Sequence, residues 1–60
     1  MLFTRYRRYI IVTDYNNNTL SKYITKVYKE RFGKVFFTAL TDTIISGIEL
    51  SQQWIDGQKT

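Results

Sequence analysis

Residues 18–33, NTLSKYITKVYKERFG, decide the predicted fold, because this stretch has the strongest periodicity in the chain. Apolar side chains recur at the i, i+3, i+4, i+7, i+8 and i+12 positions of one helical face: Leu20, Tyr23, Ile24, Val27, Tyr28 and Phe32. Asn18 or Thr19 suits the N-cap, and Gly33 suits the C-cap with Arg31 in the last turn. The pattern predicts an amphipathic helix.

The opposite side of this predicted helix is basic. Lys22, Lys26 and Lys29 are spaced i, i+4 and i+7, which places three ammonium groups in one stripe. A solvated helix face explains such a stripe, and so does a surface for an anionic partner.

The segments on either side of residues 18–33 favour strands. Residues 4–14, TRYRRYIIVTD, are dense in β-branched and aromatic side chains, and residues 35–40, VFFTAL, form a short apolar run. Residues 43–51, TIISGIELS, are ambiguous. Their β-branched residues and Gly47 favour a strand, whereas a helix over 43–55 groups Ile44, Ile48 and Ile55 on one face.

These elements predict a single small α+β domain over residues 1–60. Its amphipathic helix packs on a three-stranded sheet in β-α-β-β order, and the alternative is β-α-β-α with Ile44, Ile48 and Ile55 facing the sheet. One helix covers only one face of a sheet. Tyr9 and Ile11 lie on the other face of the predicted strand, so a further element must cover them. We expect either a dimer or partner contact there, or Trp54 and Ile55 folding back over them.

Composition excludes most catalysis. The chain has no cysteine and no histidine, so it offers no disulfide, no usual zinc site and no nucleophile–histidine triad. Its five carboxylates are scattered, and its three glycines are isolated, so no phosphate loop exists. We expect no enzymatic activity, no cofactor and no metal. Apolar runs too short for a signal peptide or a membrane span predict a soluble, cytoplasmic protein, in the host cytoplasm if the source is viral.

Nine basic and five acidic side chains give a net charge of +4. The sharpest basic cluster is Arg5-Tyr6-Arg7-Arg8-Tyr9, where guanidinium groups alternate with rings. Arginine grips phosphate and tyrosine stacks on bases, so the cluster suits single-stranded nucleic acid. We expect a continuous binding surface if it adjoins the lysine stripe of Lys22, Lys26 and Lys29.

Size and composition resemble those of small bacteriophage accessory proteins, since the chain lacks proline and is rich in Phe, Tyr, Ile, Asn and Lys. The leading expectation is therefore an inhibitor or accessory protein that acts by stoichiometric binding to a host protein or complex. The alternatives are a nucleic-acid-binding protein that uses the Arg/Tyr and Lys surface, and a structural homodimer whose interface covers Tyr9 and Ile11.

Overall fold

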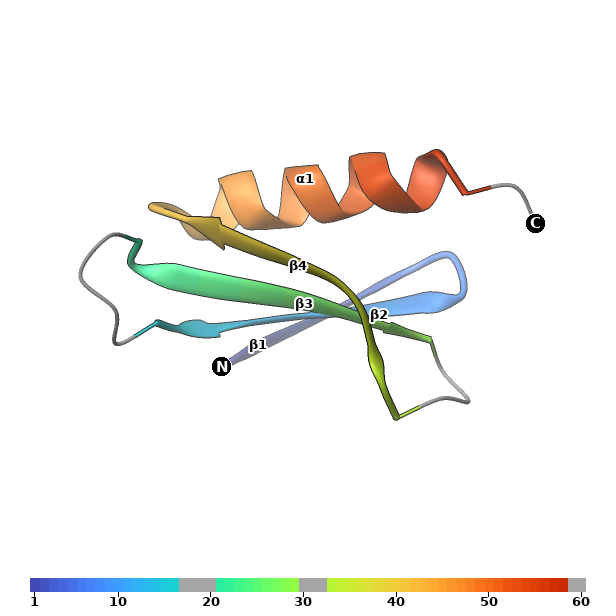
Figure 1. Cartoon of the computed structure of the whole chain (residues 1–60), viewed down its shortest axis with the longest axis horizontal. Coiled ribbons are helices and arrows are strands. Elements are labelled where there is room, and N and C mark those ends of the chain that lie inside the picture. The colour runs from blue at the N-terminus through green and yellow to red at the C-terminus, as the bar shows by residue number, and fades with distance from the viewer. Residues whose placement is uncertain (17–20, 30–32, 59–60) are drawn as a thin grey trace.

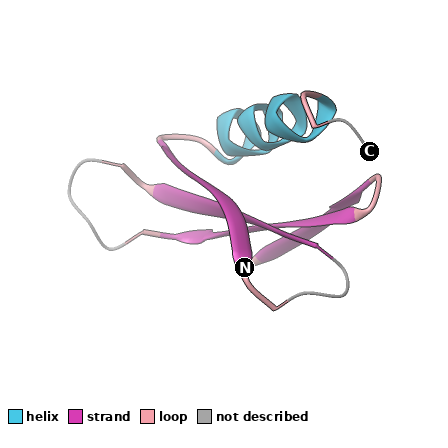
Figure 2. Ribbon diagram, turned by 45° about the vertical axis from the view of Figure 1, so that its right-hand side comes forward, coloured by secondary structure: helices cyan, strands magenta, loops and turns pink. Residues whose placement is uncertain are grey.

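The computed structural model describes residues 1–16, 21–29 and 33–58. They form four strands and one helix: β1 (Leu2–Tyr6), β2 (Tyr9–Tyr15), β3 (Tyr23–Lys29), β4 (Val35–Thr41) and α1 (Ile44–Asp56). Each strand pairs antiparallel with the next, so the sheet order is β1-β2-β3-β4. Helix α1 lies across one face of this sheet (Figures 1 and 2).

The α+β class is confirmed, but the predicted three-stranded β-α-β-β topology is wrong, as is its β-α-β-α alternative. Residues 23–29 form strand β3, where a helix was predicted. Five of these seven residues are β-branched or aromatic, and their alternation gives two usable sheet faces. The predicted cap residues Asn18, Thr19 and Arg31, together with Leu20 and Phe32, lie outside the described residues.

The single strand predicted over residues 4–14 is two strands joined by a tight turn at Arg7 and Arg8. Tyr6 pairs with Tyr9 across this turn. The backbone of Arg7 has a φ of 56°, in the left-handed region that tight hairpin turns use. Because asparagine or glycine usually marks such a turn, an arginine pair gives no sequence signal for it.

Residues 44–56 form helix α1, so the strand favoured for residues 43–51 is wrong. Thr43 caps the helix, and its side chain accepts a hydrogen bond from the Ser46 backbone N–H. Gly47, Ser51 and Ile55 follow at intervals of four residues and are buried against the sheet. The small residues bring the helix close to the strands, which explains a glycine inside a helix.

The core lies between α1 and the sheet. It is built on Tyr9, Ile11, Val27 and Ile55, with Tyr6, Phe37, Ile48 and Trp54 packed around it. The Trp54 ring stacks on Phe37 at 5.4 Å and meets the Tyr9 ring edge-on at 5.7 Å. The expectation that Trp54 and Ile55 cover Tyr9 and Ile11 is confirmed. The dimer contact predicted at Tyr9 and Ile11 is therefore misplaced, because both side chains are buried.

Two buried threonine side chains on neighbouring strands form a hydrogen bond in this core. Thr13 and Thr25 are both buried, and their Oγ1 atoms are 3.1 Å apart. One hydroxyl donates a hydrogen bond to the other, and no buried side-chain nitrogen or oxygen of the described residues lacks a partner.

Replacing Thr25 alone by valine is expected to lower the free energy of unfolding by about 1–3 kcal/mol, because the Thr13 hydroxyl is left buried without a partner. Replacing both threonines by valine should be nearly neutral, since both polar groups disappear together. Urea unfolding of the two single variants and the double variant measures this. Additive losses would contradict the pairing.

Candidate functional site

A metal-binding centre is not found in the part of the chain that the structure describes. No three ligand-type side chains there lie close enough to hold a metal ion. Within the same residues, no helix has both the length and the apolar character needed to cross a membrane. The surfaces that stand out are instead one end of the sheet and its uncovered face.

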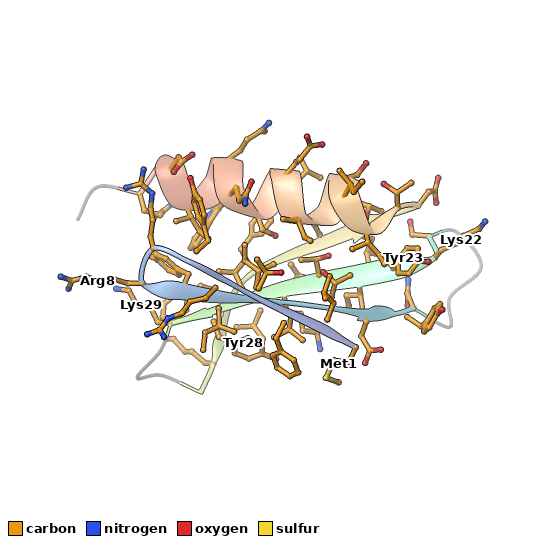
Figure 3. The ribbon with its side chains drawn as sticks, turned by 180° about the vertical axis from the view of Figure 1, so that it is seen from behind. Met1, Arg8, Lys22, Tyr23, Tyr28 and Lys29 are labelled. Carbon is orange, nitrogen blue, oxygen red and sulfur yellow. The ribbon has the colours of Figure 1, made fainter. Side chains whose placement is uncertain are left out.

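One end of the molecule collects cationic side chains from four segments. This basic end comprises side chains from β1, from the β1–β2 turn, from the end of β3 and from the residue before β4: Arg5, Arg7, Arg8, Lys29 and Lys34. The strand register explains the gathering, since Tyr9 pairs with Lys29 and Tyr28 pairs with Val35. Arg8 and Lys29 lie together at this end, whereas Lys22 lies at the other (Figure 3).

The net positive charge of the described side chains is concentrated at the basic end. It has five basic side chains and one acidic side chain, Asp56, which gives a net charge of +4. The remaining described residues carry two basic side chains, Lys22 and Lys26, and three acidic ones, Asp14, Asp42 and Glu49, which gives −1. The molecule is therefore electrically polarised along its strands.

Contacts at the basic end hold several cations beside aromatic rings. The Lys29 ammonium lies 5.8 Å from the Tyr9 ring centroid and 5.9 Å from that of Phe36. The Lys34 ammonium lies 5.5 Å from the Phe36 centroid. These distances suit cation–π attraction, so the rings position the ammonium groups without neutralising them.

Arg7 differs from the other cations of the basic end because it forms an ion pair with Asp56. The guanidinium lies 3.0 Å from the Asp56 carboxylate, which also accepts a hydrogen bond of 2.9 Å from the Tyr6 hydroxyl. The Tyr6 hydroxyl and then the Asp56 charge raise the pKa of Arg7 above its ordinary value. These contacts tie the β1–β2 turn to the end of α1.

The predicted lysine stripe does not exist as one surface. Lys22 lies at the end opposite Arg8 and Lys29 (Figure 3), and Lys26 points from the middle of β3 to the face away from α1. Lys29 alone joins the predicted arginine cluster. Within that cluster Arg5, Arg7 and Arg8 are exposed, Tyr6 is half-buried, and Tyr9 belongs to the core.

The sheet face opposite α1 is the second candidate surface, here called the open face. Strand alternation and register assign eleven side chains to it: Phe3, Arg5, Ile10, Val12, Asp14, Ile24, Lys26, Tyr28, Val35, Thr38 and Leu40. Seven are apolar or aromatic. Phe3 is 64% exposed and Leu40 is 53% exposed. In the described ranges α1 is the only helix, and it covers the other face (Figure 2).

Sequence reasoning missed Lys34, Tyr28 as a surface residue, and the open face as a whole. The available signal was the alternation within residues 23–29, which places Ile24, Lys26 and Tyr28 on one side. Reading the same residues as a helix assigned Tyr28 to the core. No family model, curated protein or solved structure matches the chain.

Proposed function

We propose that this protein is a non-catalytic binding protein whose basic end binds single-stranded nucleic acid. The observation that carries the proposal is the charge distribution. The side chains of the basic end carry a net charge of +4, while the charges of the other described side chains sum to −1. Clustered cations attract phosphates and release their counterions, which is the main source of affinity for nucleic acid.

Two features favour a single strand over a duplex. Helix α1 contains no lysine or arginine, so it does not suit the role of a recognition helix in a DNA groove. Tyr28 lies on the open face in the same cross-strand row as Arg5 and Ile10, at the border of the basic end. Its half-buried ring gives an unpaired base a surface on which to stack, beside the cations that would hold phosphates.

Fluorescence anisotropy with labelled single-stranded DNA and RNA tests the proposal. We expect micromolar affinity at about 0.1 M salt and, for about four neutralised phosphates, a slope of log K against log salt of about −3. Replacing Arg8, Lys29 or Lys34 singly by glutamine should weaken binding several-fold and reduce the slope by about 0.7 each. Each loss arises from one phosphate contact.

Lys22→Gln is the matched control, because it removes the same charge from the opposite end and should leave the affinity nearly unchanged. Tyr28→Val should weaken binding and Tyr28→Phe should retain it, if the ring stacks on a base. If polyglutamate binds as tightly as single-stranded nucleic acid, the binding is not specific to nucleic acid and the proposal is contradicted. If Lys22→Gln weakens binding as much as Lys29→Gln, the site is not at the basic end. Absence of binding would return the leading expectation from the sequence, a host protein partner, to first place.

A further inference from the structure

We propose that the open face of the sheet binds a second copy of this chain and forms a two-fold symmetric dimer. This interaction goes beyond the proposed nucleic-acid binding. It is centred on Val12, Asp14, Ile24 and Lys26, whereas Arg5 and Tyr28 lie in the row of the open face next to the basic end. The need for it comes from the fold, since a chain of 60 residues with one apolar sheet face uncovered buries little of its surface.

Two of the three charged side chains on the open face, Asp14 and Lys26, can pair with each other across a two-fold axis, and the third, Arg5, lies on the edge strand β1. Asp14 lies on β2 and Lys26 on the neighbouring β3, one cross-strand row apart, because Asp14 pairs with Ile24 and Val12 pairs with Lys26. The proposed two-fold axis lies in the plane of the interface, midway between Asp14 and Lys26 and perpendicular to the line that joins them. Rotation about this axis brings each of the two positions over the other. Asp14 of each copy then faces Lys26 of the other, which makes two ion pairs from one surface.

The apolar residues fit the same axis. The pairs Asp14–Ile24 and Val12–Lys26 are neighbouring rows of the open face and form a rectangle, with Asp14 and Lys26 at opposite corners. Val12 and Ile24 occupy the other two corners. Both therefore lie close to the proposed axis, where each faces its own counterpart. Face-to-face sheets pack about 10 Å apart, a distance that paired apolar side chains fill and that a lysine can cross to a carboxylate.

The size of the face predicts a dimer of moderate affinity. Four strands about 4.8 Å apart and seven residues of about 3.3 Å make a face of about 400 Å² per copy, larger once side chains are included. Two such faces bury about 1,000 Å², at the lower end of specific interfaces. We therefore expect a dissociation constant in the micromolar range.

Sedimentation equilibrium between about 1 µM and 1 mM tests the proposal on the full chain. The wild-type mass should rise from one copy to two across this range. Asp14→Lys and Lys26→Asp should each weaken self-association about tenfold or more, because each places like charges opposite one another. Glu49→Lys is the control, since it makes the same charge change as Asp14→Lys on an exposed helix position away from the open face.

Mixing the two variants gives the decisive result. A copy with Asp14→Lys and a copy with Lys26→Asp are complementary at both ion pairs, so the mixture should form heterodimers that neither variant forms with itself. Circular dichroism of each variant confirms that it is folded. Failure of the folded variants to associate when mixed would overturn the symmetric pairing.

Lys26→Met separates the proposal from the opposite view, in which Lys26 keeps an apolar face soluble. Loss of the ion pair should weaken the dimer, whereas loss of a protective charge would strengthen association. Stronger association of Lys26→Met, or a wild-type chain that stays monomeric to 1 mM, would overturn the proposal and assign the face to solvent or to a foreign protein.

Discussion

Replacing Gly47 by alanine is expected to lower the free energy of unfolding by about 2–3 kcal/mol, although alanine is favoured over glycine in helices by about 1 kcal/mol. A Cβ at Gly47 would overlap the Thr25 Oγ1 and lie 3.2 Å from both the Thr25 Cβ and the Thr41 Oγ1. Thr25 cannot turn aside cheaply, because it is buried and paired with Thr13. Urea unfolding gives the value.

Two companion variants make this prediction specific to the contact. Gly57→Ala should change stability by less than about 1 kcal/mol, because a Cβ there meets backbone oxygens at an ordinary 3.5 Å. In a Thr25→Ala background, Gly47→Ala should cost much less than in the wild type, since the overlapping hydroxyl is gone. An equal cost in both backgrounds would show that close approach of α1 to β3 is not the cause.

Replacing Ile55 by alanine is expected to cost about 2–5 kcal/mol, which is comparable with the total stability of about 3–5 kcal/mol expected for so small a domain. Ile55 is 2% exposed and lies in the core with Tyr9 and Ile11. The variant should therefore be largely unfolded at room temperature. Circular dichroism and thermal unfolding measure the loss.

Ile45→Ala is the matched control, because it changes the same residue type in the same helix at a position that is 70% exposed. It should shift stability by no more than about 0.5 kcal/mol. Similar losses for Ile45 and Ile55 would contradict the orientation of α1 on the sheet.

The sequence predicted the α+β class and the strand over residues 35–40, and it offered the cover of Tyr9 by Trp54 as one of two alternatives. The prediction from the sequence was wrong where a helical and a strand periodicity both fit the same residues. In residues 23–29 the predicted apolar helix face left out Thr25, although a threonine hydroxyl can be buried when it forms a hydrogen bond with a second one. The strand propensity of these residues was the better guide.

Gly47 misled the prediction in the opposite direction. A glycine among isoleucines lowers helix propensity, but propensity is a weak term when packing requires a small residue. The spacing of Gly47, Ser51 and Ile55 indicates a helix face that approaches another element closely, and this was the signal to use. For the candidate site, the sequence grouped Arg5, Arg7 and Arg8, which lie at one end of the sheet, whereas it grouped Lys22, Lys26 and Lys29 on a helix that does not form.

The order of the sheet also determines how the chain can reach its native state. Every strand pairs with its neighbour in sequence, so the loops to be closed are short and the contact order of the sheet is low, which favours rapid folding. Helix α1 follows all four strands and starts with β-branched residues and a glycine, so it depends on a formed sheet as its template. Until it docks, the nascent sheet exposes apolar side chains on both faces, and this is the stage at which aggregation competes with folding.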